Sequence, residues 1–201
     1  MVTIIGVNGK YVSSNIMKIT KSMDGHERRE LNLNEFGKIY LYFMIYSLLG
    51  WVWEKIFTLV FNGELREIGF LHIPVCIIYG VGALLILFLY YRGDYDLFTI
   101  FLGSTIVIGI LEFFTSWMME KLFHRVWWDY STWIYNLQGR ISLISSLAFG
   151  FFGLIIVKWG HSFIYKVLDK YFQKRISIII SFILLTVTVI DLIFTSSILL
   201  K

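Results

Sequence analysis

The chain has little charge, a single proline and a single cysteine. Charged residues make up 16% of its 201 positions, whereas 57% are hydrophobic and 18% are aromatic. A soluble protein of this size could not stay dispersed with so few polar side chains for its surface. The composition therefore excludes an ordinary soluble domain and predicts that a lipid bilayer is the solvent.

The lone cysteine and the lack of a phosphate-binding loop exclude several kinds of site from this chain. Cys76 alone excludes an intramolecular disulfide and a metal cage of several thiolates. The stretch GVNGK at 6–10 is too short for a GxxxxGKS/T loop, so ATP hydrolysis would need a separate ATPase subunit. Glu112 and Glu120 are eight residues apart, with no histidine at metal-ligand spacing in the apolar stretches. We therefore predict no cofactor and no metal site.

Five hydrophobic windows are each long enough to cross a bilayer, which takes about 20 mostly apolar residues. They are too long for the strands of a membrane barrel and lack strict alternation, so they predict helices. We expect an all-α, polytopic membrane protein with five transmembrane helices: 39–61, 71–91, 97–123, 141–159 and 176–200.

The polar stretch before the first window predicts a cytosolic tail over 1–36, disordered or weakly helical, with Asn34 as the N-cap of the first span. It has no apolar core before a cleavage site, so no signal peptide is expected. Residues 37–201 would form one transmembrane domain. Twelve Lys and Arg lie on the side of the tail and six on the other, which predicts a cytoplasmic N-terminus. This bias accounts for the net charge of +4, so no nucleic-acid partner is inferred.

Two patterns in and after the fourth window indicate packing surfaces. Ser142, Ser146, Gly150 and Gly153 share one helix face, where another helix can approach closely. Over 158–175, hydrophobic residues recur at helical spacing with lysines between them. This predicts a short interfacial helix before the last span, its lysines over anionic headgroups. A helix that binds a partner protein is the alternative.

Acidic residues inside the apolar windows are the most informative feature. Glu54, Glu112 and Asp191 each lie fifteen residues into an odd-numbered window. Because these windows run in the same direction, the three carboxyl groups should lie roughly 22 Å from the starting face. A charge in mid-membrane is costly and normally faces a protein interior or a wet cavity. We expect a polar chamber in the outer half of the membrane; a structural hydrogen-bond network with Arg140 is the alternative.

The connection 124–142, HRVWWDYSTWIYNLQGRIS, is predicted to cap this chamber. Trp and Tyr at a membrane boundary usually form an interfacial belt, which is our expectation for Trp133 and Tyr135. Aromatic faces beside Asp129 suit an organic cation, although Arg140 could instead hold Asp129 in a bidentate pair. The predicted ligand-binding residues are Glu54, Glu112, Glu120, Trp127, Trp128, Asp129, Tyr130, Asn136, Arg140 and Asp191.

Several stretches resemble one family: YSLLGWVWEKIF (46–57), GFLHIPVCIIYGVG (69–82), LEFFTSWMMEKLFHRVWWDYS (111–131), NLQGRISLISSLAFG (136–150) and VIDLIFTSS (189–197). Together they are similar to the CmpB-type family of bacterial membrane proteins, labelled ABC-transporter permeases of type IV. Ile73 and Ile77 stand where that family has Gly and Pro, which bears on the start of the second helix. The resemblance implies a transport role in the cell membrane and carries over no substrate or catalytic residue.

Three functions fit these patterns. The first is a permease-like or substrate-binding subunit whose chamber accepts a small cationic or amphiphilic solute, as a homo-oligomer or with an ATPase. The second is a non-catalytic partner in immunity, sensing or assembly that uses the small-residue face of the fourth helix. The third is a membrane-embedded enzyme acting on a lipid headgroup or isoprenoid. It would use Glu54 or Glu112 as general acid or base and Arg140 to hold a phosphate.

Overall fold

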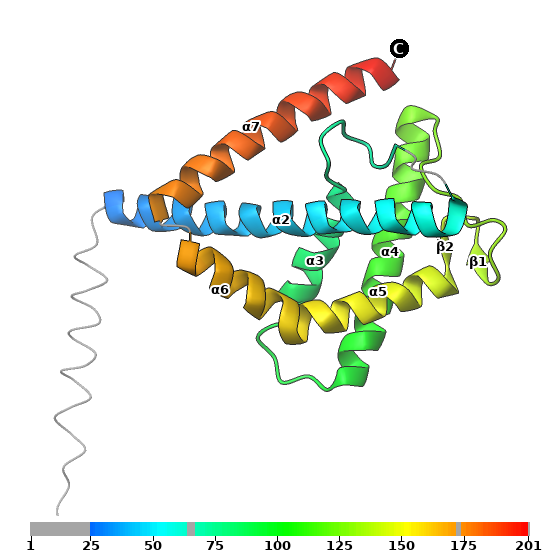
Figure 1. Ribbon diagram of the computed structural model, residues 1–201, viewed down its shortest axis with the longest axis horizontal. Helices are drawn as coiled ribbons and strands as arrows, with labels where there is room; N and C mark the ends of the chain where they lie inside the picture. The colour runs from blue at the N-terminus through cyan, green and yellow to red at the C-terminus, as the bar shows by residue number, and fades with distance from the viewer. Residues whose placement is uncertain (1–24, 64–66, 172–173, 201) are drawn as a thin grey trace, which may run out of the picture.

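The computed structural model describes residues 25–63, 67–171 and 174–200, and these are mostly helical (Figure 1). The elements are α2 (Gly25–Asn62), α3 (Ile77–Tyr90), α4 (Leu97–Phe123), β1 (Asn136–Leu137), β2 (Ile141–Ser142), α5 (Leu143–Ile155), a π-helical turn (Ile156–Gly160), α6 (His161–Tyr171) and α7 (Lys174–Leu199). The predicted helical architecture is confirmed.

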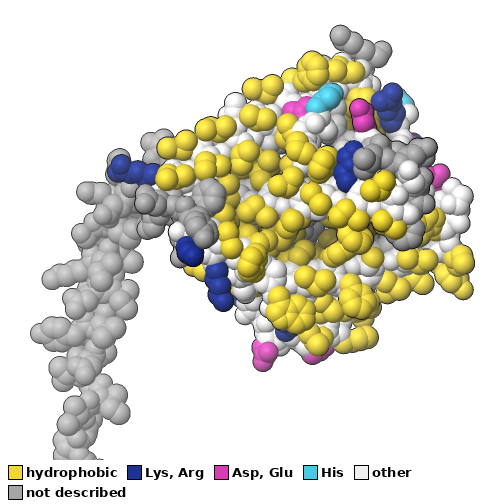
Figure 2. Space-filling model, viewed as in Figure 1, with side chains coloured by type: hydrophobic (Ala, Val, Ile, Leu, Met, Phe, Trp, Pro, Cys, Tyr) yellow, Lys and Arg dark blue, Asp and Glu magenta, His cyan; other side chains and the backbone are white. Residues whose placement is uncertain are grey.

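Four helical stretches are long and apolar enough to cross a membrane: Glu35–Val60, Leu97–Phe123, Leu143–Leu168 and Arg175–Leu199. The fifth apolar helix, α3, has only 14 residues and is roughly 21 Å long, against a hydrocarbon core of about 30 Å. Hydrophobic side chains cover most of the face seen in Figure 2, and charged ones lie toward its edges. The chain is a multi-pass membrane protein; five crossings and the cytoplasmic N-terminus stay predictions.

The first helix begins earlier than predicted. The chain passes through Asn34 in helical conformation, because α2 starts at Gly25, so the N-cap predicted at Asn34 is wrong. The sequence GHERRELNL at the start of α2 contains several good helix formers, which explains the extension. The remainder of the predicted tail, residues 1–24, lies outside the described residues.

The second helix begins later than predicted, at Ile77 and not at 71. The backbone N–H of Cys76 donates to the carbonyl of Ser47 on α2 (3.0 Å). The N–H of Ile73 donates to the Asp191 carboxylate on α7 (2.9 Å). Pro74 has no N–H to give. Residues 67–76 are non-helical, and α2 and α7 accept hydrogen bonds from two of their amides, which helps to satisfy the backbone in a bilayer environment.

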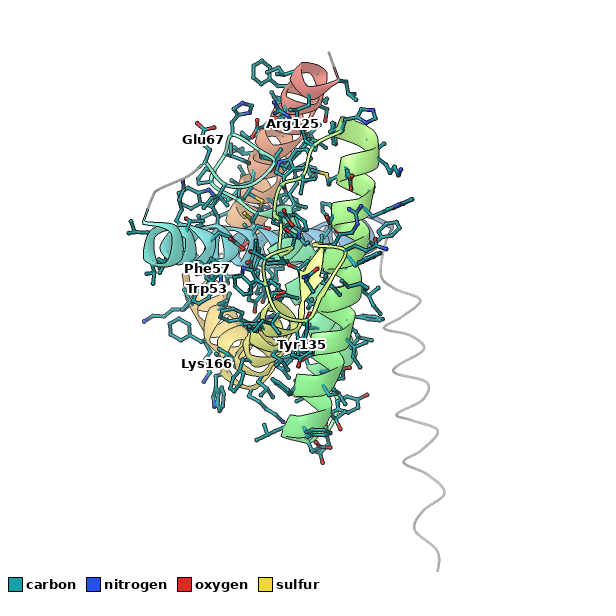
Figure 3. All side chains as sticks on the ribbon, turned by 90° about the vertical axis from the view of Figure 1, so that its right-hand side faces the viewer. Trp53, Phe57, Glu67, Arg125, Tyr135 and Lys166 are labelled. Atoms are coloured by element: carbon teal, nitrogen blue, oxygen red, sulfur yellow. The ribbon has the colours of Figure 1, made fainter. Side chains whose placement is uncertain are left out.

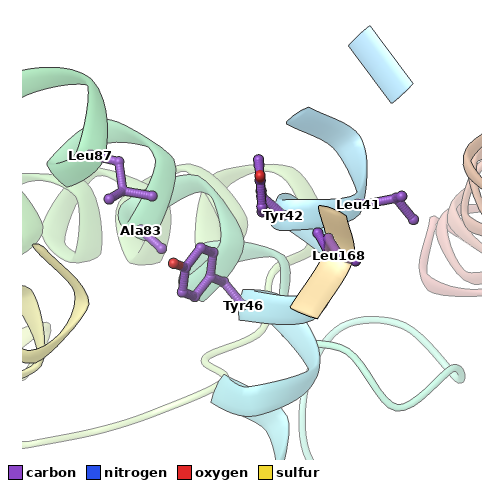
Figure 4. Packing of buried hydrophobic residues seen from close by; sticks show 6 residues of the cluster. All are labelled: Leu41, Tyr42, Tyr46, Ala83, Leu87 and Leu168. Carbon is purple, nitrogen blue, oxygen red and sulfur yellow. The ribbon is translucent and has the colours of Figure 1, made fainter. Parts of the chain in front are cut away.

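The fourth window also has different limits from those predicted. Its first two residues form β2, which pairs antiparallel with β1, so α5 begins at Leu143. At its other end the helix continues through the π-helical turn into α6, which covers the stretch predicted as a short helix before the last span; its position at the membrane interface stays a prediction. Leu168 of α6 is buried in a cluster with Leu41 and Tyr46 of α2 (Figure 4).

The helices form two groups that pack against each other. α2 packs against α3 and α7, α4 packs against α5, and α3 joins the two groups through α4. The predicted small-residue face of α5 is buried: a Cβ added at Gly153 would lie 2.3 Å from Ser104 Oγ of α4. Such close approach supplies van der Waals contact between helices, which is the main attraction available in lipid.

The start of α5 provides a test of local stability. Ser142 is the N-cap: its hydroxyl accepts from the N–H of Ser145 (3.1 Å), and the Ser145 hydroxyl accepts from the N–H of Ser142 (3.2 Å). Replacing Ser142 by Ala should lower the free energy of unfolding by about 1 kcal/mol, because the hydroxyl that accepts from the Ser145 N–H is lost. Thermal unfolding in detergent measures the change. Ser197→Ala, at an exposed position on α7, should have little effect, and equal effects would contradict this role.

Candidate functional site

A pocket of about 1360 Å³ lies between α2, α3, α4 and the helix formed by α5 and α6, under residues 124–142, hereafter the aromatic loop. Most of its lining side chains are apolar, and the polar ones gather where the aromatic loop meets α2 and α4. A largely apolar hollow with a few convergent polar groups is the usual form of a small-molecule site.

The first acidic group of the pocket is Glu54 of α2. Its carboxylate accepts a short hydrogen bond from the Tyr79 hydroxyl of α3. The Tyr79 ring lies directly over Gly50, one helical turn before Glu54, because a Cβ at Gly50 would be 2.1 Å from Tyr79 Cγ. The glycine thus allows α3 to bring its phenol to the carboxylate.

The second acidic group is Glu112 of α4, which is only 4% exposed. Its Oε1 accepts from the Tyr130 hydroxyl of the aromatic loop (3.0 Å). Its Oε2 is buried without a hydrogen-bond partner among the described residues. A buried carboxylate oxygen without a partner is costly, so Glu112 presents an unused acceptor at the pocket wall.

Tyr130 connects the two acidic groups. Burial raises the pKa of its hydroxyl well above the usual range, and the nearby carboxylates of Glu112 and Glu54 raise it further. The phenol therefore keeps its proton and remains a donor at physiological pH. Glu54 of α2 and Glu112 of α4 both line the pocket; that the two carboxylates form one binding site stays a prediction.

Arg140 does not pair with Asp129, which was one of the predicted arrangements. Its guanidinium forms a short ion pair with Glu120 and donates to the hydroxyl of Ser116 (3.3 Å), both on α4. The Arg140 carbonyl accepts from the Trp128 indole N–H (2.9 Å). Arg140 and Glu120 thus fasten the aromatic loop to α4, and the charge of Arg140 is already matched by Glu120.

Asp129 and Asn136 shape the aromatic loop. The Asp129 carboxylate accepts from the N–H (2.8 Å) and hydroxyl (3.0 Å) of Ser131. The Asn136 amide donates to the carbonyls of Ser131 (3.1 Å) and Trp133 (2.9 Å) and accepts from the N–H of Gly139 (3.0 Å). Asp129 lines the pocket, whereas Asn136 lies outside it and holds the turn. The predicted role of Asn136 in ligand binding finds no geometric support.

The aromatic side chains of the loop divide into two groups. Trp127, Trp128, Tyr130 and Trp133 line the pocket, whereas Tyr135 is 79% exposed. The belt position expected for Trp133 and Tyr135 stays a prediction. Trp133 meets Tyr130 edge to face (5.3 Å between ring centroids) and lies near Phe57 of α2 in a tilted arrangement (6.2 Å).

Two residues that sequence reasoning missed extend this aromatic wall. Trp53 and Phe57 lie one turn apart on α2 (6.4 Å between centroids; Figure 3), and Trp53 meets Phe152 of α5 edge to face (4.8 Å). Tyr79, which holds Glu54, was also not among the predicted ligand-binding residues. The available signal was the helical spacing of Trp53 and Phe57 around Glu54.

Asp191 does not join the other two intramembrane carboxylates. Its Oδ1 lies 2.9 Å from His72 Nδ1 and its Oδ2 accepts from the N–H of Ile73, while the Thr195 hydroxyl donates to Oδ1 (3.2 Å). Asp191 is not among the residues that line the pocket. The predicted meeting of three acidic residues is therefore wrong for Asp191, which anchors residues 67–76 against α7.

This placement predicts that Asp191 affects stability and not ligand binding. Asp191→Asn would keep the shape but weaken charge-assisted hydrogen bonds to the segment before α3, with an expected loss of about 1.5–3 kcal/mol. Hydrogen exchange at the Ile73 amide should become faster, while ligand affinity should stay within about twofold. A large loss of ligand affinity in a folded Asp191→Asn protein would show that Asp191 takes part in ligand binding after all.

Among the described residues, no group of three or more His, Cys, Asp and Glu side chains could hold a metal ion. The polar end of the pocket thus offers carboxylates, phenols and indole faces. These groups can accept hydrogen bonds from an ammonium ion or contact its methyl groups through aromatic faces.

Comparison with known proteins returned one informative result. No curated protein and no solved structure matches the chain. A family model described as "Putative ABC-transporter type IV" matches residues 41–196, which include every residue that lines the pocket. The resemblance noted in the sequence is confirmed: the chain belongs to this ABC-transporter-like family of membrane proteins.

Proposed function

We propose that this protein is a permease-like or substrate-binding membrane subunit whose pocket binds a small solute carrying a cationic group. The family membership and the apolar helices support a membrane transport-associated protein. The observation that carries the finer proposal is the buried Glu112 carboxylate, which lines an aromatic pocket with one oxygen unpartnered.

The charge balance of the pocket favours a cation over an anion. Among the described lining residues, the acidic ones outnumber the single basic one, Arg140, which Glu120 already pairs. An anionic solute would meet Glu54 and Glu112 with no free cationic side chain in the lining to receive it. The acidic lining residues are Glu54, Glu67, Glu112, Glu120 and Asp129.

Equilibrium dialysis of the detergent-purified protein tests this proposal. Choline is compared with dimethylbutanol, its uncharged isostere, which has the same shape without the positive charge. We expect choline to bind at least about tenfold more tightly, because cation–π and charge-assisted contacts are worth about 2 kcal/mol in a desolvated site. No binding of choline, or equal binding of the two, would overturn the proposal.

The energy source of transport would lie in another chain. We propose an ATPase subunit as partner, in keeping with the family, within the cell membrane. Purification in mild detergent tests this part: a stoichiometric ATPase supports transport. A stoichiometric partner without ATPase activity would favour the non-catalytic alternative, in which the protein serves assembly or sensing.

A further inference from the structure

The pocket extends well beyond its acidic end into an apolar arm between α2, α3 and the α5–α6 helix. Among the described lining residues, the stretches 46–53, 77–86 and 149–164 contribute no charged side chain. The arm is lined by Leu49, Ile86, Phe149, Phe152, Ile155 and Ile164, among others.

The dimensions of the arm exceed what a small cation needs. Along α2, lining residues run from Glu54 back to Tyr46, which is roughly 12 Å of helix. The whole pocket holds about 1360 Å³, whereas sites for drug-sized molecules usually hold about 300–1,000 Å³. A methylated ammonium group would fill the acidic end alone and leave the arm empty.

The arm is also open toward the outside of the helix bundle. Leu49 of α2 is 53% exposed and Ile155 of α5 is 48% exposed, and both line the pocket. In a membrane-spanning bundle that surface faces acyl chains. A molecule dissolved in the bilayer could therefore enter the arm sideways, tail first, without passing through water.

We propose that the pocket binds a cationic amphiphile, with its ammonium head between Glu54 and Glu112 and its hydrocarbon tail in the arm. This rests on the proposed function and narrows its substrate class. The two ends of the pocket recognise different parts of the ligand. The carboxylates and the aromatic loop bind its positive charge, and the arm binds its hydrocarbon tail. A polar solute of the same charge would occupy only the acidic end of the pocket.

The test compares two trimethylammonium ligands that differ in their tails, choline and decyltrimethylammonium. The full-length protein is reconstituted in phosphatidylglycerol nanodiscs, whose lipid has no trimethylammonium group to compete for the site, and uptake by empty nanodiscs is subtracted. We expect decyltrimethylammonium to bind at least about tenfold more tightly than choline, since each buried methylene contributes to affinity. Equal affinities would overturn the amphiphile proposal and leave the proposed function intact. Absence of choline binding would overturn the proposed function as well.

Variants in the arm make the test specific to this part of the pocket. Leu49→Trp and Ile155→Trp would each fill the arm from a half-exposed position. Both should weaken decyltrimethylammonium binding about tenfold and leave choline within about twofold. Ile110→Trp, 66% exposed on α4 and outside the pocket lining, is the matched control and should change neither. Equal weakening of both ligands by the arm variants would contradict a tail site in the arm.

Discussion

Replacing Glu112 by Gln weakens choline binding at least about 30-fold, if the carboxylate of Glu112 receives the cation. Gln has the same shape and can still accept from the Tyr130 hydroxyl, which bonds to Oε1 at 3.0 Å. What the substitution removes is the unpartnered Oε2, and with it the negative charge that the carboxylate would present to a bound cation. Removing one partner of a buried charge pair costs about 2 kcal/mol or more, which corresponds to this loss of affinity.

The matched control for Glu112→Gln is Asp94→Asn, which removes one carboxylate at an exposed position outside the pocket lining. Its effect on equilibrium binding should stay within about twofold. Glu54→Gln should resemble Glu112→Gln, because both carboxylates line the pocket. If all three variants bind choline like the unaltered protein, the acidic end of the pocket does not bind cations.

Replacing Gly50 by Val should lower both stability and choline binding, because fold and site meet at this residue. A Cβ at Gly50 would lie 2.1 Å from Cγ and 2.4 Å from Cβ of Tyr79. Since these atoms are at the base of the Tyr79 side chain, rotation of the ring cannot relieve the clash and α3 must shift. Overpacking of this kind costs about 1–3 kcal/mol, and the shift would take the phenol away from Glu54.

Unfolding in detergent and equilibrium dialysis measure the two effects of Gly50→Val. Leu48→Val is the control on the same helix, because Leu48 is 43% exposed and does not line the pocket. It should leave both quantities nearly unchanged. A Gly50→Val protein as stable as the unaltered chain would contradict the close packing of α2 on α3.

The sequence predicted the apolar helices well because each long hydrophobic window is a local property of the chain. It failed where a distant residue decides the local conformation. Residues 71–76 were predicted to be helical. In the structure the Asp191 carboxylate accepts a hydrogen bond from the N–H of Ile73, and the Ser47 carbonyl accepts one from the N–H of Cys76. No local sequence pattern shows that these two amides donate hydrogen bonds to groups on other helices.

The candidate site shows the same division between local and distant information. Counting residues along each helix predicts a common depth for Glu54, Glu112 and Asp191 but not the direction of each side chain around its axis. Glu54 and Glu112 turn toward the pocket, and Asp191 turns toward residues 67–76. Likewise, the sequence offered Asp129 as a partner for Arg140, and only the fold shows that Glu120 is its partner.

Protection of carboxyl groups from a hydrophobic carbodiimide tests the central claim most directly. The reagent is added with increasing choline, and labelled peptides are quantified by mass spectrometry. We predict that labelling of Glu54 and Glu112 falls together, with the same midpoint as choline binding, while labelling of Asp191 does not change and dimethylbutanol protects none of them. Undiminished labelling of Glu54 and Glu112 at saturating choline would contradict the claim that these two carboxylates form one cation-binding site.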